Sequence, residues 1–473
     1  RVTRQFFDED RPWAKKDPEV RDGTAVVISE ELLLTGASMI QNATFIQVEK
    51  HGRADWIPAR LVHQDSAINL ALLTVDQPGF FDDLTPAEIA ASAKTGGVVH
   101  SVRWKDRQLE VSNSRPGRIE VIESPYGSVH HAILRLSTDF SAGGWADPVF
   151  ADDKLIGMTV AQDGQTATVV PAEIIKAYGE SPARDGENSG YRGFASIGAL
   201  RWQTNTDRAL AAYLGLEGEP RGIFIRQVPW GSTGCSSLQP HDILMELDGH
   251  KIDASGNYHH PLYGQLRFGH IVVEGHAPGD VVPARVFRDR QFIEVEIELR
   301  RYPSSARLIP WRRADSGPPY LVAGGFVFRE LDGRYLRTWG NDWDTKAPNQ
   351  LRYFYYLLGN AQSPERRRII VVSHVLPAAY NIGYHGVANL LVKSINGIEI
   401  DSIAEAEEAF KQPKDDLHRI AFYPNFAVRE VILDGPTLEE ATQAILSAYD
   451  VPDRIRLPDS ELPELGPDCP NVH

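Results

Sequence analysis

The sequence predicts a mainly β protein with about three domains. Its 473 residues are too many for one hydrophobic core, because domains usually hold about 100–200 residues. Before about residue 180, β-rich runs of strand length at 24–28, 44–48 and 70–75 alternate with polar or glycine-bearing turns, as in a barrel or sandwich. The stretch 179–193 is polar and rich in Gly, Ser and Pro, which is the composition of a linker.

Composition excludes two kinds of partner. The net charge of -15 argues against a broad nucleic-acid surface, because phosphate binding needs a positive excess on at least one face. No stretch approaches the roughly 18 uninterrupted apolar residues of a membrane span. We therefore expect neither nucleic acid nor a transmembrane segment.

The cysteines and histidines predict no metal or cofactor. Cys235 and Cys469 have no metal-ligand spacing, and they either pair in an oxidising compartment or stay free. Residues 258–260 contain two adjacent histidines, but no third ligand is evident, so a loop is expected there. The chain starts at Arg1 without methionine, which predicts a processed, extracytoplasmic protein, periplasmic or secreted, with an organelle lumen as the alternative.

Four segments carry a resemblance over the first 180 residues. The segments at 23–28, 33–40, 68–73 and 143–148 resemble the trypsin-like domain of the HtrA (Deg) serine proteases. That family carries Leu-Thr-Asn-Ala-His, Asp-Ile/Leu-Ala-Leu-Leu and Gly-Asn-Ser-Gly-Gly-Pro in the last three. The resemblance implies a chymotrypsin-like double β-barrel in a domain of residues 1–180. It places the family's His, Asp and Ser on Ser38, Asn69 and Trp145.

None of these three residues supplies the group that a serine-protease triad needs. A triad requires a hydroxyl nucleophile, an imidazole base and an orienting carboxylate. The former oxyanion loop is expected at Gly143, Gly144 and Asp147, where the Asp147 carboxylate would oppose developing negative charge. The chain is therefore expected to be a pseudoenzyme, with the indole of Trp145 filling the cleft.

An active endopeptidase with displaced catalytic groups is the alternative. Its nucleophile would be Ser141, Ser137 or Ser128, with His130 or His131 as the base.

Residues 181–302 comprise the linker and a segment that resembles an HtrA-type PDZ domain. The match is Leu-Gln-Pro-His-Asp-Ile-Leu at 238–244 followed by Asp-Gly at 248–249, with His241 where the family has Gly. Such a module binds an extended peptide as an added strand. The expected groove residues are Arg221, Gly222, Ile223, Phe224 and Ile225, with Leu262 and Leu266 on the opposite wall. The alternative is that a neighbouring domain covers this edge.

Residues 303–473 resemble the second PDZ domain of the plant-type Deg branch. The resemblance rests on residues 320–328, 375–384 and 390–400, with a helical extension at 438–449. It implies a second groove at Gly324, Gly325 and Phe326. The aromatic-rich stretch 339–356 is expected to fill a core or a seam between domains.

Together these features predict a chymotrypsin-like double β-barrel followed by two PDZ-like α/β modules. The expected function is a non-catalytic scaffold or chaperone-like assembly factor that binds proteins or peptides with extended or C-terminal segments. The alternatives are the active endopeptidase and a purely structural subunit of a larger assembly. The resemblance also implies a homo-oligomer, typically a trimer, and we expect Phe6, Phe7 and Trp13 at its contact.

Overall fold

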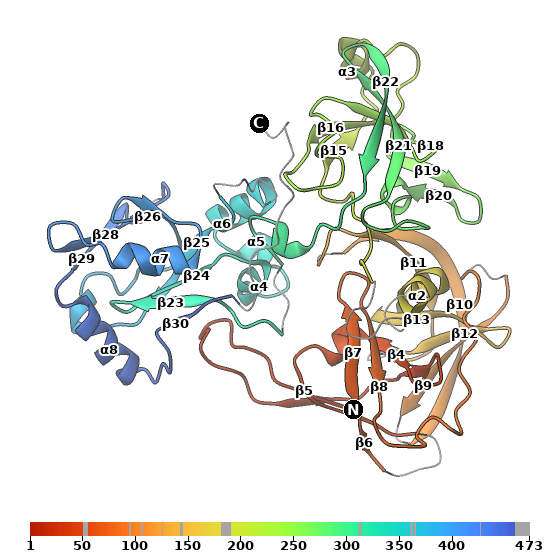
Figure 1. Cartoon of the computed structure of the whole chain (residues 1–473), viewed down its shortest axis with the longest axis horizontal. Helices are drawn as coiled ribbons and strands as arrows, with labels where there is room; N and C mark the ends of the chain where they lie inside the picture. Colours follow the sequence, from red (N-terminus) through yellow and green to blue (C-terminus); the bar gives the residue numbers. More distant parts are fainter. Residues whose placement is uncertain are drawn as a thin grey trace. The chain divides into compact units, whose positions relative to one another are not determined.

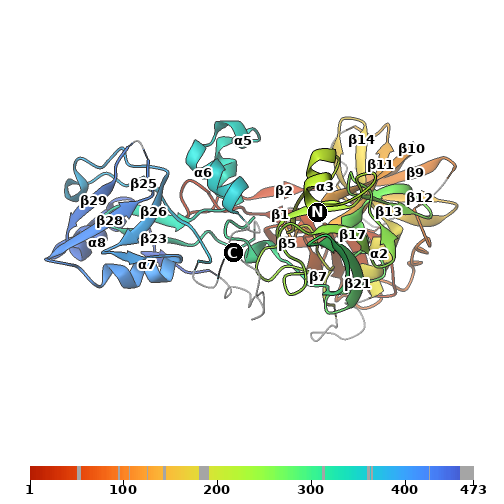
Figure 2. The ribbon, with the colours of Figure 1, turned by 90° about the horizontal axis from the view of Figure 1, so that it is seen from above.

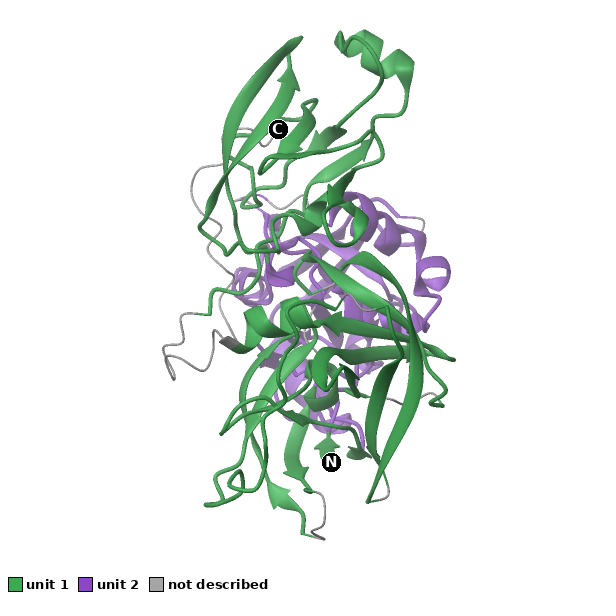
Figure 3. Ribbon diagram, turned by 90° about the vertical axis from the view of Figure 1, so that its right-hand side faces the viewer, with its two compact units in different colours: residues 1–4, 18–302, 466–473 green, residues 5–17, 303–465 purple. Residues whose placement is uncertain are grey.

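The computed structural model of the chain forms two compact units (Figure 1, Figure 3). The structure describes residues 1–50, 55–93, 96–105, 107–124, 126–141, 145–180, 191–311, 315–359, 363, 366–425 and 427–458. Of these, the first unit holds residues 1–4 and 18–302, and the second holds residues 5–17 and 303–458.

The first unit begins with two four-stranded sheets, ordered β2-β1-β5-β6 and β3-β4-β8-β7. At the centre of the second sheet, every residue of β4 and β8 is buried, because both are nearly continuous apolar runs. The strands are β1 (Val2–Arg4), β2 (Glu19–Arg21), β3 (Val26–Val27), β4 (Leu33–Gly36), β5 (Ala43–Val48), β6 (Ile57–Pro58), β7 (Arg60–Asp65) and β8 (Leu70–Thr74). Helix α1 (Ala37–Ile40) follows β4.

A closed barrel follows, in the order β10-β11-β14-β13-β12-β9. The 16-residue strand β10 pairs with β9 through its first half and with β11 through its second half, and closure leaves no free edge. The strands are β9 (Val99–Lys105), β10 (Gln108–Glu123), β11 (His130–Ser137), β12 (Pro148–Ala151), β13 (Lys154–Asp163) and β14 (Thr166–Pro171). Helix α2 (Ala172–Glu180) ends this part.

The first α/β module completes the first unit. Its main sheet runs β15-β16-β17-β21-β22, with β18 paired to β17, and a separate hairpin joins β19 and β20. The elements are β15 (Arg201–Thr204), α3 (Arg208–Leu214), β16 (Ile223–Gln227), β17 (Ile243–Leu247), β18 (His250–Lys251), β19 (Asn257–His260), β20 (Gly264–Arg267), η2 (Phe268–His270), β21 (Val281–Arg288) and β22 (Gln291–Glu298). Asp207 caps the start of α3.

The second unit contains one larger sheet, ordered β29-β28-β26-β25-β24-β23-β30, with β27 paired to β26. Its strands are β23 (Tyr320–Ala323), β24 (Phe326–Glu330), β25 (Ile370–Val375), β26 (Leu390–Ile395), β27 (Ile398–Glu399), β28 (Leu417–Phe422), β29 (Glu430–Asp434) and β30 (Ile455–Arg456). Its helices are η3 (Ser304–Ala306), α4 (Gly333–Leu336), η4 (Arg337–Trp339), α5 (Trp343–Lys346), α6 (Asn349–Tyr353), η5 (Phe354–Leu358), η6 (Ala379–Asn381), α7 (Ile403–Phe410) and α8 (Leu438–Ala448).

Both α/β modules contain a short hairpin that turns at a residue pair ending in glycine. Asp248 and Gly249 join β17 to β18 with φ of 47° and 74°, and Asn396 and Gly397 join β26 to β27 with φ of 54° and 80°. Two successive positive φ angles define the tight turn that Asp-Gly and Asn-Gly favour. The mainly β fold class is confirmed. No helix among the described residues is long and apolar enough to cross a membrane.

The aromatic-rich stretch is only partly internal. Trp343 and Phe354 are buried in a cluster with Tyr335 and Leu351, as a core would require. The side chains of Tyr353 and Tyr356 are about half exposed. This stretch therefore builds a small core and also presents aromatic rings to solvent.

Residues 5–17 leave the first unit after β1 and pack on the second unit. The Trp13 ring lies 6.0 Å from that of Tyr320, and the Arg456 guanidinium lies 5.2 Å from the Phe7 ring centroid. The Phe6 carbonyl accepts a hydrogen bond from the Lys16 backbone N–H. Phe7 and Trp13 thus have partners in their own chain, and an oligomer contact at Phe6, Phe7 and Trp13 stays a prediction.

A buried ion pair fixes this segment. The Glu9 carboxylate lies 2.9 Å from Arg329 Nη2 and 3.2 Å from Arg334 Nε, and the Arg329 side chain is 1% exposed. Loss of one partner from a buried pair leaves an uncompensated charge.

Within the first unit, histidines line the contact between the closed barrel and the first α/β module. The His130 ring packs so closely on Gly198 and Gly269 that a Cβ at either glycine would lie 2.7 Å from a ring atom. His270 is buried, and its Nε2 lies 3.8 Å from Glu274 Oε2. Burial lowers the pKa of His130 and of His270 to about 4.

We predict that Glu9→Gln destabilises the full chain by about 3–5 kcal/mol, because the Arg329 guanidinium loses its charge partner in a buried site. Urea unfolding followed by tryptophan fluorescence measures this loss. Asp17→Asn, at an exposed position of the same segment, is the control and should change the free energy of unfolding by less than about 0.5 kcal/mol. Equal effects of the two variants would contradict the assignment.

A second prediction concerns pH. Unfolded histidine gains its proton near a pKa of about 6.5, whereas His130 and His270 stay neutral in the fold down to about 4. The neutral rings therefore make their full contribution to the free energy of unfolding above pH 6.5. As the pH falls towards 4, that free energy decreases by up to about 1.4 kcal/mol per pH unit for each proton that only the unfolded chain binds. His270→Asn should flatten the fall in melting temperature across this range, and His259→Gln, at an exposed position, should not. Identical slopes in all three proteins would refute the prediction.

Candidate functional site

The pairing of β4 with β8 brings Ser38 and Asn69 into contact. The Ser38 backbone N–H donates to Asn69 Oδ1 at 2.7 Å, and Asn69 Nδ2 donates to the Val160 carbonyl at 3.3 Å. The backbone of Asn69 has a φ of 58°, which asparagine tolerates better than most residues. The amide group of Asn69 thus connects the sheet that contains β4 and β8 to the closed barrel.

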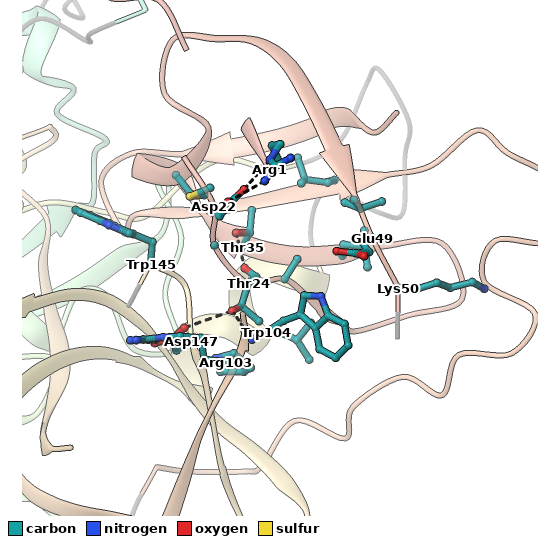
Figure 4. Close-up of a pocket in the computed structure, with 18 of the residues that line it drawn as sticks. Arg1, Asp22, Thr24, Thr35, Glu49, Lys50, Arg103, Trp104, Trp145 and Asp147 are labelled. Atoms are coloured by element: carbon teal, nitrogen blue, oxygen red, sulfur yellow. Dashed lines mark hydrogen bonds and ion pairs between the residues drawn. The ribbon is translucent and has the colours of Figure 1, made fainter. Parts of the chain in front are cut away.

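Trp145 lies beside the same region, at the wall of a cavity of about 1030 Å³ (Figure 4). Its carbonyl accepts a hydrogen bond from the Thr24 N–H at 3.2 Å, and the Arg21 guanidinium lies 4.3 Å from its ring centroid. The indole is half-buried and lines the cavity, so it does not fill this space. Gly143 and Gly144 lie outside the described residues.

Asp147 is buried and already has its own counter-charge. Arg103 donates to Asp147 Oδ2 from Nε at 3.0 Å and from Nη2 at 2.8 Å, and the Thr24 hydroxyl donates to Oδ1 at 3.3 Å (Figure 4). Burial raises the pKa of the Asp147 carboxyl, and Arg103 and Thr24 oppose that shift. The carboxylate is therefore part of a buried ion pair that ties the start of β12 to β9.

The residues proposed for a displaced active site take part in a domain contact. The Ser128 carbonyl accepts hydrogen bonds from the Gly198 N–H and the Ser196 hydroxyl, and His131 Nδ1 lies 3.0 Å from the Ala132 carbonyl. In the described part of the chain, no hydrogen bond joins His130 or His131 to a hydroxyl of Ser128, Ser137 or Ser141. Sequence reasoning gave no signal for this contact.

The predicted peptide edge at residues 221–225 is wrong. Strand β16 pairs with β15 on one side and with β17 on the other, so it offers no free backbone edge. Ile223 and Ile225 are fully buried, and the Phe224 ring stacks on that of His241.

The loop before β16 is not a carboxylate clamp either. The Gly222 N–H donates to the Ile252 carbonyl at 3.0 Å. Arg221 Nη1 donates to the carbonyls of Glu217 and Glu219, each at 3.2 Å. The donors of this loop are therefore used within the module.

The outer strand of this sheet is β15. In the described residues of the first unit, β15 pairs with β16 alone and stands at the end of the strand order. The ring centroids of Trp202 and Phe268 lie 5.4 Å apart, and the Arg267 guanidinium lies 5.3 Å from the ring centroid of Trp202. Sequence reasoning missed β15, although the apolar residues just after the linker were a signal for it.

The opposite wall also differs from the prediction. Leu266 is buried in the core of the module, so it lines no groove, whereas Leu262 is 45% exposed between β19 and β20. Phe268 is buried in the same way, so the partly exposed side chains beside β15 on this side are Trp202 and Arg267.

The segment that leads into β15 is held by β7, by the loop before β11 and by the end of its own module. The Tyr191 hydroxyl donates to Asp65 Oδ2 at 2.6 Å, the Ser196 N–H donates to the Arg300 carbonyl at 2.9 Å, and the Ser196 hydroxyl donates to the Ser128 carbonyl at 2.6 Å. These bonds fix the position at which β15 starts.

In the second unit, the predicted groove is filled by the chain itself. Gly324 and Gly325 form the turn between β23 and β24, and β24 pairs with β23 on one side and β25 on the other. Helix α7 lies beside β23 (Figure 2), and Leu321 and Ala323 are fully buried in the same cluster as residues of α7. Strand β23 therefore occupies the place between β24 and α7 that a peptide would need.

The described residues contain no cluster of three or more His, Cys, Asp or Glu side chains that could hold a metal ion. His260 Nδ1 accepts the N–H groups of Leu262 and Tyr263, each at 3.2 Å, and Nε2 lies 2.8 Å from Glu274 Oε2. Because Nδ1 accepts these two N–H groups, the ring hydrogen that faces the carboxylate is on Nε2. Cys235 is disulfide-bonded, and Cys469 lies outside the described residues.

Comparisons with known proteins agree with this architecture. A family model described as a PDZ domain matches residues 309–455. Protease Do-like 2, chloroplastic, from Arabidopsis thaliana is 23% identical over 454 residues, covering 94% of this chain and 72% of that protein. Protease Do-like 4, mitochondrial, from the same plant is 21% identical over 449 residues, covering 93% and 81%. The solved structure of the HtrA-type protease AlgW with tripeptide is 18% identical with a TM-score of 0.46, covering 64% of this chain and 94% of that one.

These comparisons contradict the expectation that the chain is not an enzyme. That expectation rested on three substituted positions, whereas the relatives that match more than nine-tenths of the chain are named as proteases. The chain is similar over nearly its whole length to Do-like serine proteases of the HtrA (Deg) type, and it carries a PDZ domain.

Proposed function

We propose that this chain is an HtrA-type protein of the plant-type branch with two PDZ modules, and that its first module binds extended peptides along the outer edge of β15. One observation carries the proposal. The second module, which matches a PDZ family model, has a strand in the position beside β15 that no strand of the described residues fills.

The two modules share one strand order. The order β15-β16-β17-β21-β22 in the first corresponds to β24-β25-β26-β28-β29 in the second, and each has a short hairpin strand on its third member. By this correspondence β24 is the counterpart of β15. In the second module β23 adds to β24 in antiparallel register, with Tyr320 opposite Arg329 and Val322 opposite Val327.

Strand β23 therefore serves as a template for the ligand. A peptide beside β15 would run antiparallel to it, and main-chain hydrogen bonds to the edge would supply affinity irrespective of sequence. Alternate ligand side chains would face a wall formed by the half-buried Trp202 ring and the Arg267 guanidinium beside it. Aromatic side chains at such a wall favour apolar ligand residues.

The partners follow from this mode of binding. They are proteins or peptides with an extended or C-terminal segment, and the chain holds them as a scaffold, alone or in a homo-oligomer such as a trimer. The disulfide at Cys235 supports an extracytoplasmic compartment or an organelle lumen, because disulfides persist where the environment is oxidising.

A displayed library of peptides with free C-termini tests the proposal. We predict saturable enrichment by the intact chain and at least a tenfold loss of affinity in either Gln203→Pro or Thr204→Pro. Successive residues of a strand point their N–H groups to opposite sides, so one of the two variants removes a donor from the outer edge.

Two controls make the test specific. Glu294→Pro alters β22, the strand at the other end of the sheet, and should leave binding unchanged if the protein stays folded by circular dichroism. Arg221→Ala changes the site that the sequence first suggested, and it should also have no effect. Absence of enrichment, or equal losses in all four variants, would refute binding at β15.

A further inference from the structure

Among the described residues, the first part of the trypsin-like region does not close into a barrel. Its eight strands form two separate sheets of four, whereas the second part is a closed barrel. Eight strands around one interior leave space either for core side chains or for one small ligand. The interior between these two sheets is therefore a place to look for a ligand site.

A cavity of about 1030 Å³ begins in this interior and reaches the cleft at Trp145 (Figure 4). Small-molecule sites usually measure about 300–1,000 Å³, so this volume suits a sizeable ligand. Its deep wall is formed by Leu33, Ile46, Leu73 and Phe80, each no more than 9% exposed. Apolar walls of this kind hold water poorly, which favours an occupant with a long apolar part.

The polar groups in the middle of the cavity are already used. The Thr35 hydroxyl donates to the Thr24 carbonyl at 3.0 Å, and the Thr24 hydroxyl donates to Asp147 (Figure 4). If a ligand with polar groups along its length, such as a peptide, were bound, its polar groups would have no hydrogen-bond partners in the middle of the cavity. The polar part of the ligand must therefore lie at the mouth.

The charged side chains around the cavity are mainly cationic. Five cationic side chains line it against three carboxylates, although the whole chain carries a net charge of -15. Four of these five cations have carboxylate partners: Arg1 pairs with Asp22, Arg103 with Asp147, Arg107 with Glu49, and Lys50 with Asp83, which lies outside the lining. The remaining excess of one positive charge, on the exposed Lys105, favours an anionic head group at the mouth.

Two of these cations lie near the turn between β9 and β10. Lys105 ends β9 and is exposed, and the Arg107 side chain is 64% exposed, so its guanidinium can serve both Glu49 and a ligand. An arginine guanidinium has five donors and binds a carboxylate through two of them.

We propose that this cavity is a binding site for a long-chain carboxylate. The hydrocarbon chain lies between the two four-stranded sheets, and the carboxylate contacts Lys105 and Arg107 at the mouth. This site is separate from the peptide edge of β15 and does not depend on it.

Three probes of equal chain length test the proposal on the intact protein: dodecanoate, dodecanol and dodecyltrimethylammonium. The fluorescence of Trp56, Trp104 and Trp145, which line the cavity, reports binding. We expect one dodecanoate per chain, with affinity at least tenfold higher than for dodecanol, and weakest binding of the cation.

Two kinds of variant locate the site. Lys105→Glu with Arg107→Glu should weaken dodecanoate at least tenfold and leave dodecanol unchanged, because only the head-group contact is lost. Ala87→Trp places an indole at the cavity wall and should weaken both probes. Lys16→Glu with Lys176→Glu, two exposed positions away from the cavity lining, is the charge-matched control and should change neither.

Several outcomes would overturn the proposal. These are no saturable binding of dodecanoate, equal affinity for all three probes, more than one molecule per chain, or binding that survives both the mouth variant and Ala87→Trp. Circular dichroism of each variant confirms that it is folded, and the mouth variant changes only exposed side chains, so it tests the site even if Ala87→Trp does not fold.

Discussion

The hydrogen-bonding groups of strand edges are the constraint on which this structure most depends. A strand at the end of a sheet presents a row of N–H and C=O groups that need partners. The six strands β9–β14 satisfy theirs by closing into a barrel, and β24 satisfies its outer edge with β23. In the first module the same edge, on β15, ends the sheet within the described residues. This difference separates a module that has filled its own groove from the one whose edge we propose as the peptide site.

Buried ion pairs fix the position of two segments that lie outside the strands of these sheets. Arg103 and Asp147 join β9 to the chain just before β12, and Glu9 joins residues 5–17 to Arg329 in β24. Each pair is largely shielded from solvent, so it fixes position more than it adds net stability. The cavity of the first two sheets differs, because two of its cations, Lys105 and Arg107, are exposed at its mouth.

Local patterns in the sequence predicted the fold well and the site poorly. The β-rich runs at 44–48 and 70–75 form β5 and β8, because strand propensity and turn signals act within a few residues. The outer position of β15 follows from strand order, which periodicity does not encode, so the edge was assigned to residues 221–225 instead. The pairing of Glu9 with Arg329 spans 320 residues and had no local signal. The expectation of a pseudoenzyme was based on the residues at three positions, whereas the similarity to proteins named as proteases extends over nearly the whole chain.

Hydrogen exchange of the intact chain with and without an enriched peptide tests the central claim most directly. The account predicts slower exchange of backbone amides at residues 201–204 in the presence of the peptide, and unchanged exchange at residues 326–330, where β23 already fills the edge. Slower exchange at 326–330 with no change at 201–204 would contradict it, since the peptide would then have displaced β23 and left β15 unoccupied.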